Sequence, residues 1–377
     1  MLVWYVRPHK TYKYTKLTYT KLISISYRLS LTCPWPAGFF MMSPNTWSVD
    51  RQQLERPITL ESTSARVAIS QEAPGNDVVV QLPPWLDDAA ERDSISRQVR
   101  RMLRLEGWQE TMDAFQAVVP GSGGFHPTFR SPRLWEDLVK TLLLCNCGWS
   151  RSLLMAEALV REVGSGERFP EPGDFGAWSE PELRQRTGVG YRAKSLLRLA
   201  QGCRDGSIDL AWFESAAVEG RDPEEVFRRA LELPGVGPYG AANVCQLLGI
   251  YRFVPADTET VRHLKHAHGV SCDLRSVRQR AQQHYASAAP FQFLAYWREL
   301  WEGYESLAGP IRLLDPALYK IFTGANMTKG RNGQFAATPS RKRGRRDVRE
   351  AGPATPAVAV ELAANGKPAG RRRLRVL

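Results

Sequence analysis

One stretch of this 377-residue chain decides its fold: Leu231-Glu232-Leu233-Pro234-Gly235-Val236-Gly237-Pro238-Tyr239-Gly240-Ala241-Ala242-Asn243-Val244. We expect one helix to end near Leu231 and a second to begin at Pro238, because proline suits the first position of a helix. Gly235 and Gly237 permit positive φ and leave no side chain over the turn. The N–H groups of the turn and of the next helix then point outward. The stretch therefore predicts a backbone cradle for a phosphate.

This turn has a simpler alternative, in which the two glycines only connect two packed helices. The sequence downstream favours a ligand site. It reads Arg252-Phe253-Val254-Pro255-Ala256-Asp257-Thr258-Glu259-Thr260-Val261-Arg262, and it places Asp257 at the start of another helix. An aspartate there can cap the helix by accepting a backbone N–H bond. That structural role is compatible with a catalytic one.

The residues around the hairpin predict a mainly α fold. Apolar residues between Asp93 and Ala325 recur at intervals of three to four, as in Ile95, Val99 and Met102. We expect a core of about ten short helices, preceded by a small segment at 77–82 that is able to form a strand. The expected helices include 153–163, 180–186, 191–202, 223–231, 238–248, 258–267, 274–285 and 291–304.

The positive charge of the chain lies at its two ends. The net charge is +12, but residues 1–49 hold six basic residues and no acidic one, and residues 324–377 hold thirteen basic and three acidic residues. Residues 50–323 keep 32 basic and 36 acidic residues, so net charge does not predict nucleic-acid binding by the folded part. We expect a disordered or targeting segment at 1–76, a folded domain at 77–323 and a disordered basic tail at 324–377.

Both ends have features of targeting sequences. Residues 1–49 have the composition of an organellar transit peptide, with a later start at Met41 or Met42 as the alternative. The basic cluster at 341–346 predicts a nuclear-import signal or an arm that binds phosphates, and we expect a nuclear protein. No apolar stretch reaches the ~20 residues of a membrane span, so we expect a soluble protein without a membrane helix.

The hairpin and the segment after it resemble the helix-hairpin-helix (HhH-GPD) superfamily of base-excision DNA glycosylases. Its Leu-Pro-Gly-Val-Gly signature is matched by residues 233–237, and its Val-Pro-x-Asp signature by residues 254–257. Residues 95–103 are similar to the helix that opens the catalytic core in the alkylated-base and oxidised-purine branches, and residues 188–194 are similar to a helix–turn element that precedes the hairpin. The resemblance covers about residues 78–323. It implies a monomeric DNA-repair enzyme that flips a damaged or mismatched base from duplex DNA and hydrolyses its N-glycosidic bond.

The resemblance also implies the chemistry. Asp257 matches the catalytic carboxylate, which stabilises positive charge on the sugar and activates water. Members with lyase activity have a lysine where this chain has Tyr239, and a phenol cannot form an imine, so we expect a monofunctional glycosylase. Members with an iron–sulfur cluster have four closely spaced cysteines after the catalytic helix. Only Cys272 lies beyond Asp257, and we expect no cluster and no other cofactor or metal.

The hairpin and two nearby turns are the expected DNA contacts. Asn146 falls where related enzymes fill the gap left by the flipped base. Arg192 and Lys194 are candidate phosphate partners, with a solvated helix face as the alternative. The full set of predicted DNA-binding residues is Gly235, Val236, Gly237, Tyr239, Gly240, Asn146, Arg192 and Lys194.

Aromatic side chains are the candidates for the base pocket. Phe125, Trp149 and Phe291 are the predicted residues, from a wider group that also contains Phe129, Phe293, Tyr296 and Trp297. Packing in the core is the alternative for each of them. An aromatic pocket would suit electron-poor, alkylated bases, but the sequence does not select the base. A non-catalytic DNA-binding protein remains the alternative function, because an aspartate that only caps a helix gives the same pattern.

Overall fold

An antiparallel sheet of five strands occupies the N-terminal part of the protein. The computed structural model describes residues 21–25, 38–61, 63–71, 77–123, 125 and 128–324. The sheet has the order β1-β5-β4-β3-β2. Its strands are β1 (Lys21–Ile25), β2 (Thr46–Ser48), β3 (Gln53–Thr59), β4 (Ser64–Ser70) and β5 (Val78–Leu82). The basic cluster at 341–346 lies outside the described residues, as do residues 1–20 and 26–37 of the predicted transit peptide.

A row of aliphatic side chains holds three of these strands together. Leu54 of β3 pairs with Ile69 of β4, which pairs with Val80 of β5, and all three are fully buried. Removing these side chains from water favours the sheet over separate segments. The predicted domain boundary after residue 76 is therefore wrong, since residues 46–70 share one sheet with the expected strand at 77–82.

Helices make up the rest of the described chain, and the mainly α prediction is confirmed. The helices are α1 (Ala89–Leu103), α2 (Trp108–Val118), α3 (Leu134–Leu144), α4 (Trp149–Glu162), α5 (Glu180–Thr187), α6 (Arg192–Asp205), α7 (Leu210–Ser215), α8 (Pro223–Glu232), α9 (Pro238–Leu247), α10 (Thr258–His268), α11 (Val277–His284) and α12 (Gln292–Ala308). Short 3-10 helices are η1 (Gly38–Met41), η2 (Pro172–Ala177), η3 (Ala286–Ala288), η4 (Ile311–Leu313) and η5 (Pro316–Ile321). No helix among the described residues is long and apolar enough to cross a membrane.

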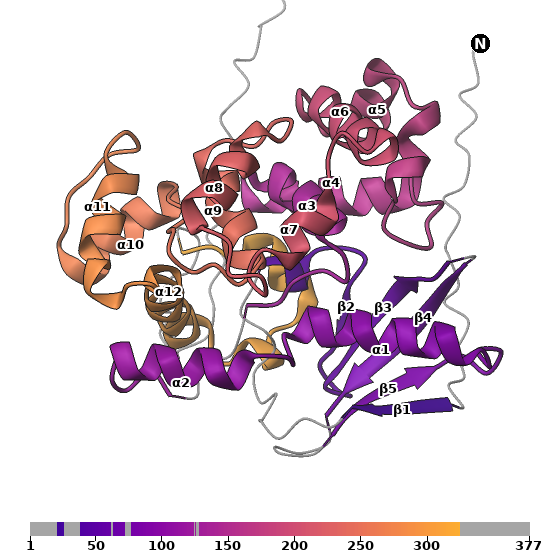
Figure 1. Ribbon diagram of the computed structural model, residues 1–377, viewed down its shortest axis with the longest axis horizontal. Helices are drawn as coiled ribbons and strands as arrows, with labels where there is room; N and C mark the ends of the chain where they lie inside the picture. The colour runs from indigo at the N-terminus through magenta and orange to yellow at the C-terminus, as the bar shows by residue number, and fades with distance from the viewer. Residues whose placement is uncertain are drawn as a thin grey trace, which may run out of the picture. The chain divides into compact units, whose positions relative to one another are not determined.

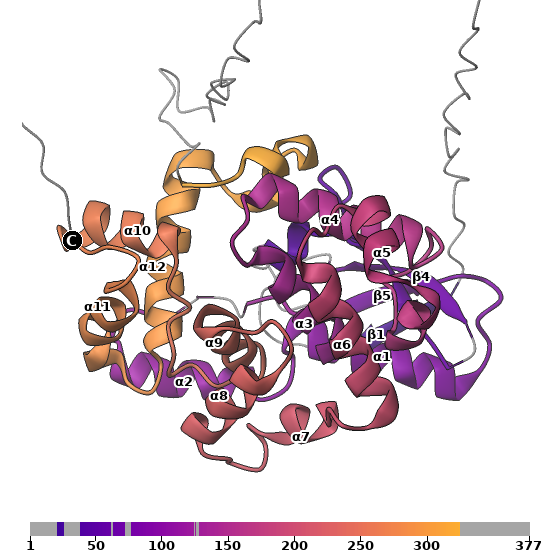
Figure 2. The same cartoon turned by 90° about the horizontal axis from the view of Figure 1, so that it is seen from above.

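Buried charges tie the sheet to the helices. Helix α1 lies across one face of the sheet (Figures 1 and 2). The Arg56 guanidinium of β3 forms an ion pair of 2.9 Å with Glu136 of α3, which also pairs with Lys140 at 2.7 Å. These side chains are almost fully buried, so removing one partner would leave an unpaired charge in the core. The network therefore sets the position of α3 relative to the sheet.

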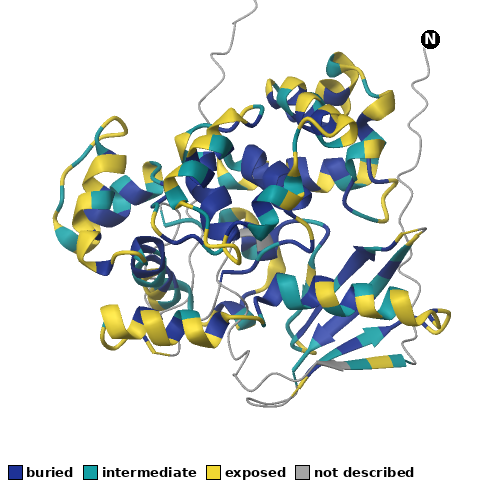
Figure 3. Ribbon diagram, in the orientation of Figure 1, coloured by how far each residue is buried: buried dark blue, intermediate teal, exposed yellow. Residues whose placement is uncertain are grey.

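Helices α3 and α9 lie at the centre of the helical part, and most of their residues are buried (Figure 3). Two arginines fix the C-terminal end of α9. Arg104 donates to the carbonyl oxygens of Gln246 and Leu247 at 2.7 and 3.1 Å, and Arg130 donates to Leu247 at 3.0 Å. Cations at a helix C-terminus are favoured by the helix dipole and satisfy free carbonyl groups. This anchor holds the hairpin that precedes α9.

Candidate functional site

The turn between α8 and α9 has a backbone that requires glycine. Gly235 has a φ of +80°, which side chains disfavour. A Cβ atom at this position would lie 2.6 Å from Ser195 Oγ of α6 and 3.2 Å from Leu142 Cδ2 of α3. Gly240 allows a second close contact, since a Cβ there would lie 3.0 Å from Val236 Cγ1. These glycines let the hairpin pack directly on α3 and α6.

The same turn presents free backbone donors. The N–H groups of Gly235, Gly237 and Tyr239 have no hydrogen-bond partner among the described residues. The Val236 N–H differs, because it donates to Leu233 O at 3.1 Å. The expectation that Val236 contributes a free amide is therefore wrong: its side chain is buried and its amide closes the turn. The remaining donors point from a helix N-terminus, where partial positive charge collects.

Asn146 and Lys194 lie in turns and helices near this hairpin. Asn146 is exposed, adopts a positive φ of +47°, and donates from Nδ2 to the Tyr191 hydroxyl at 3.3 Å. Lys194 is exposed near the start of α6, next to Ser195, which packs against Gly235. Both side chains are thus open to solvent on elements that border the turn.

Arg192 does not fit its predicted role. Only 6% of the residue is exposed, and its guanidinium donates to Leu142 O at 2.9 Å and to Cys145 O. These carbonyl groups end α3, so Arg192 closes the C-terminus of that helix. The Arg192 guanidinium binds these carbonyl groups inside the protein, so the prediction that it contacts a phosphate is wrong.

Asp257 caps the N-terminus of α10. Its Oδ1 atom accepts hydrogen bonds from the N–H groups of Glu259 and Thr260 at 2.9 and 3.0 Å, and from the Thr260 hydroxyl at 3.2 Å. Its own N–H donates to Thr260 Oγ1 at 3.2 Å, which completes a capping box. All three accepted bonds end on Oδ1. Oδ2 therefore has no hydrogen bond within the described part of the chain and is available to a ligand.

A further hydrogen bond, between the hydroxyl groups of Thr260 and Tyr296, helps to fix the Asp257 carboxylate. The Thr260 hydroxyl, which is fully buried, lies 2.9 Å from the Tyr296 hydroxyl of α12. When Thr260 donates to Asp257, Tyr296 supplies the proton of this second bond. The chain Tyr296–Thr260–Asp257 therefore orients the carboxylate from the α12 side.

Burial changes the protonation of two groups in this region. Desolvation raises the pKa of Asp257 above its ordinary value, against the opposing effect of its backbone hydrogen bonds, and the nearby Glu259 charge adds to the rise. Desolvation, together with the Asp257 charge, also raises the pKa of Tyr239. Tyr239 thus stays a neutral phenol, while Asp257 is a stronger base than an exposed aspartate.

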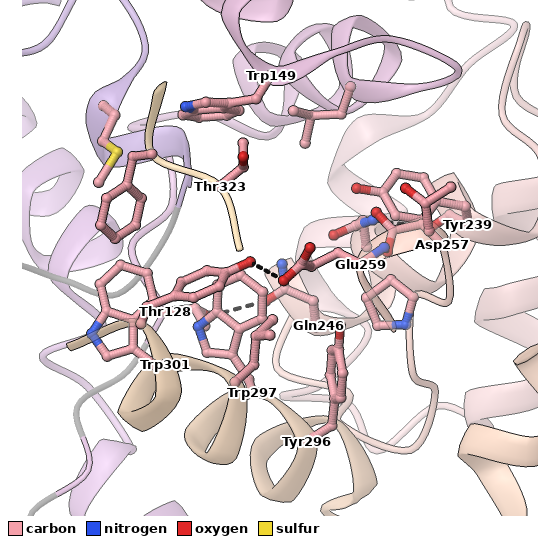
Figure 4. A pocket seen from close by; sticks show the side chains of 18 of the residues that line it. Thr128, Trp149, Tyr239, Gln246, Asp257, Glu259, Tyr296, Trp297, Trp301 and Thr323 are labelled. Atoms are coloured by element: carbon pink, nitrogen blue, oxygen red, sulfur yellow. Dashed lines mark hydrogen bonds between the residues drawn. The ribbon is translucent and has the colours of Figure 1, made fainter. Parts of the chain in front are cut away.

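Asp257 lies in the wall of a pocket of about 360 Å³. Figure 4 shows Trp149 across this pocket from Trp297 and Trp301, with Glu259 between them. Its walls come from Met41, from residues 128–129, from residues 144–149 between α3 and α4, from α9, from residues 255–259 at the start of α10, from α12 and from residues 322–323. The lining includes Met41, Thr128, Phe129, Leu144, Cys147, Trp149, Tyr239, Asn243, Gln246, Pro255, Asp257, Glu259, Phe293, Tyr296, Trp297, Leu300, Trp301, Tyr304, Phe322 and Thr323.

The predicted pocket residues are only partly placed there. Trp149 lines the pocket, and its indole N–H donates to Tyr319 O at 2.6 Å. Phe291 does not line it, because its ring packs on Phe115 at 5.8 Å between centroids. Phe125 is also absent from the lining and packs against the core. The lining does contain the other members of the wider aromatic group, which are Phe129, Phe293, Tyr296 and Trp297.

Sequence reasoning missed several lining residues. Trp301 and Tyr304 continue the face of α12 that begins at Phe293. Their helical spacing from Phe293 and Trp297 could therefore have identified them as pocket residues. Glu259 gave a weaker signal, since an acid in the first turn of a helix is common. Its Oε1 atom accepts from Arg262 Nε at 2.7 Å and from the Tyr304 hydroxyl at 2.8 Å. A second carboxylate therefore stands in the pocket beside Asp257.

Solved structures with a similar fold include two that each align over about three quarters of this chain. The 3-methyladenine DNA-glycosylase from Archaeoglobus fulgidus aligns with a TM-score of 0.55 and 16% identity, over 77% of this chain and 100% of that one. MBOgg1, solved in complex with a low affinity DNA ligand, aligns with a TM-score of 0.52 and 16% identity, over 76% of this chain and 99% of that one. No family model and no curated protein matches the sequence. The likeness confirms the predicted resemblance to the helix-hairpin-helix glycosylases at the level of the fold.

Proposed function

We propose that this protein is a DNA glycosylase of base-excision repair, which acts on duplex DNA containing a damaged or mismatched base. The observation that carries the proposal is the placement of Asp257. Its carboxylate is fixed at the N-terminus of α10 and borders an aromatic pocket, and α9, which begins at the amide-rich turn, forms another wall of that pocket. A phosphate site and a base-sized pocket are the two parts that a base-flipping enzyme needs. The shared fold with a DNA-glycosylase supports this reading.

The proposed reaction depends on the free oxygen of Asp257. In the transition state the sugar develops positive charge as the bond to the base breaks. A carboxylate with one oxygen held by two N–H groups and a hydroxyl keeps its position, and its other oxygen can face the sugar or orient the attacking water. The raised pKa of Asp257 favours its action as the base that takes a proton from this water.

The pocket walls favour an electron-poor base. Trp149, Trp297 and Trp301 offer indole faces, which attract cations through the ring quadrupole. Glu259 adds a carboxylate whose Oε1 is already bound by Arg262 and Tyr304, so Oε2 remains for a ligand. Arg262 already neutralises the charge of Glu259, so its Oε2 can contribute as a hydrogen-bond acceptor, while the indole faces would stabilise a base that carries positive charge after alkylation. We therefore infer that cationic alkylated purines are the preferred substrates.

The absence of lyase activity is also part of the proposal. Tyr239 lines the pocket two residues after Gly237, at the position where lyase members have a lysine. Its phenol lacks an amine, so no covalent imine with the sugar can form there. Neither an iron–sulfur cluster nor another cofactor is needed for the proposed hydrolysis.

A base-release assay tests the function. The full-length protein is incubated with matched duplexes that contain an alkylated, oxidised, deaminated or mismatched base, and alkali then reveals abasic sites. We expect release from the alkylated duplex and no strand cleavage before alkali. Borohydride treatment should trap no covalent complex. A trapped complex would contradict the hydrolytic mechanism.

The same assay separates catalysis from simple DNA binding. If the protein binds duplex DNA but releases no base from any substrate, the non-catalytic alternative holds. Release from the oxidised duplex alone would keep the glycosylase function and overturn the inferred preference for alkylated bases.

A further inference from the structure

A second cluster of polar side chains lies outside the pocket, between α10 and α12. It consists of His263 and His268 of α10 and Glu299 of α12, which we name the His–Glu cluster. The ligand atoms of these three residues lie within 4.8 Å of one another. The proposed glycosylase reaction uses none of them, so their convergence needs a separate explanation.

The geometry of the cluster centres on one carboxylate oxygen. His268 Nε2 lies 2.8 Å from Glu299 Oε2, and His263 Nε2 lies 3.4 Å from the same atom. In a tetrahedral zinc site with ligand bonds of 2.0–2.2 Å, neighbouring ligand atoms lie about 3.3 Å apart. The two separations from Glu299 Oε2 bracket this value, and the ligand atoms of the two histidines lie within 4.8 Å of each other. Two histidines and one carboxylate also form a common ligand set for this ion, with the fourth position left to water.

The surroundings suit a bound cation. The Tyr285 hydroxyl donates to Glu299 Oε2 at 2.7 Å and also lies 3.1 Å from His263 Nε2 and 3.4 Å from His268 Nε2. It therefore contacts all three side chains of the cluster and is placed to orient them or to supply an oxygen as the fourth ligand. The side chains of His268 and Glu299 are 23% and 39% exposed, whereas that of His263 is 6% exposed. An ion could therefore enter from solvent and reach a buried ligand.

We propose, in place of the sequence-based expectation of no metal, that the His–Glu cluster binds a divalent transition-metal ion of the zinc class, and that this ion fastens α10 to α12. Helix α10 begins at the Asp257 cap, and α12 carries Tyr296 and the tryptophans of the pocket. The ion would therefore fix the position of α10, with the Asp257 carboxylate at its start, relative to the α12 wall of the pocket. The role is structural, and it stands whether or not the protein cleaves DNA.

The test uses untagged full-length protein that has been treated with a chelator and dialysed. Zn²⁺ is added in isothermal titration, and Co²⁺ is added while the visible absorption is recorded. The variants are His268→Gln and Glu299→Gln. The matched control is His266→Gln, because His266 is an exposed histidine of the same helix outside the cluster.

We expect one ion per chain, with affinity weakened about a hundredfold or more in the two cluster variants and unchanged in the control. Cobalt should give the bands of nitrogen and oxygen ligation without a thiolate charge-transfer band. Zinc should also raise the unfolding temperature of the wild type and of the control, but not of the cluster variants. Equal binding by all four proteins, no binding, or a thiolate band would overturn the proposal.

Discussion

The hairpin and the pocket hold a ligand by different means. At the hairpin, the free donors are main-chain N–H groups of Gly235, Gly237 and Tyr239, which belong to one continuous stretch. At the pocket, the contacts are side chains from seven separate parts of the chain, with α12 as the largest contributor. The hairpin depends on the absence of side chains, whereas the pocket depends on their identity.

This difference predicts which function each region controls. A backbone site recognises what all nucleotides share, which is the phosphate. A site made of side chains can select one base and can place one carboxylate. Changes in the pocket should therefore alter cleavage with little effect on DNA affinity, and changes at the hairpin should do the reverse.

The largest expected effect comes from Asp257→Asn. Asparagine can still cap α10, but it carries no charge and cannot accept the proton of a water molecule. We expect the single-turnover rate of base release to fall by roughly 10²–10⁴-fold, with the DNA dissociation constant changed less than about threefold. Quench-flow kinetics and fluorescence anisotropy measure the two quantities. An equal loss of rate and affinity would remove the proposed separation of roles.

Gly237→Ala should weaken phosphate binding at the hairpin without changing the fold, and Gly235→Ala is the contrasting variant. A Cβ at Gly237 meets nothing within 4 Å and the φ is −98°, so the fold should tolerate it. The added methyl group would still obstruct a phosphate that approaches the amides. Losing one charged hydrogen bond costs about 1.5–3 kcal/mol, which corresponds to a decrease in affinity of roughly 10- to 150-fold.

Gly235→Ala should act through the fold instead. Its Cβ would lie 2.7 Å from Ser195 Cβ, and its φ of +80° is strained for alanine. We expect the midpoint of urea unfolding to fall for Gly235→Ala and to stay unchanged for Gly237→Ala. DNA affinity retained in Gly237→Ala would show that the turn is only a connection between two helices.

The same contrast explains what the sequence could predict. The hairpin and the Asp257 cap depend on neighbouring residues, so the local pattern located both of them. Arg192 was misassigned because its partners, Leu142 and Cys145, are about 50 residues away. Glu259 was overlooked because its role depends on how α12 packs beside α10.

The number of strands in the sheet was underestimated for a related reason. Strand β2 has only three residues, and β3 contains the charged residues Glu55 and Arg56 and a proline, which obscure its alternation. Arg56 is nonetheless buried, because Glu136 of α3 neutralises it. A charge that is paired across the fold cannot be recognised as a core residue from its own segment.

A third prediction concerns the pH dependence of stability at Asp257. Its pKa is raised in the folded protein, so the protonated form favours folding, and this contribution is lost as the pH rises from about 3.8 through the raised value. Asp257→Asn cannot ionise and avoids this loss. We expect its free energy of unfolding to exceed that of the wild type near neutral pH, because only the wild type must keep a desolvated negative charge in the folded state.

Urea unfolding of both proteins between about pH 4 and pH 7 measures this difference. The gap between variant and wild type should widen as the pH rises, while base release by the wild type increases over the same range. A constant gap would indicate that burial of Asp257 does not affect its ionisation, and the pocket would then lack the desolvated carboxylate proposed above.

The smallest expected effect is that of Lys194→Ala on DNA affinity. Lys194 is exposed on α6 beside the hairpin, and one phosphate contact contributes about one unit to the slope of log affinity against log salt. We expect affinity to fall only a few-fold at physiological salt and the slope to decrease by about one. Lys265→Ala is the matched control, because Lys265 is equally exposed but lies on α10. If both variants lower the slope alike, the lysines attract DNA only through their general positive charge, and the hairpin does not position a particular phosphate. If only Lys194→Ala lowers it, the phosphate site at the hairpin includes the Lys194 side chain as well as the backbone amides.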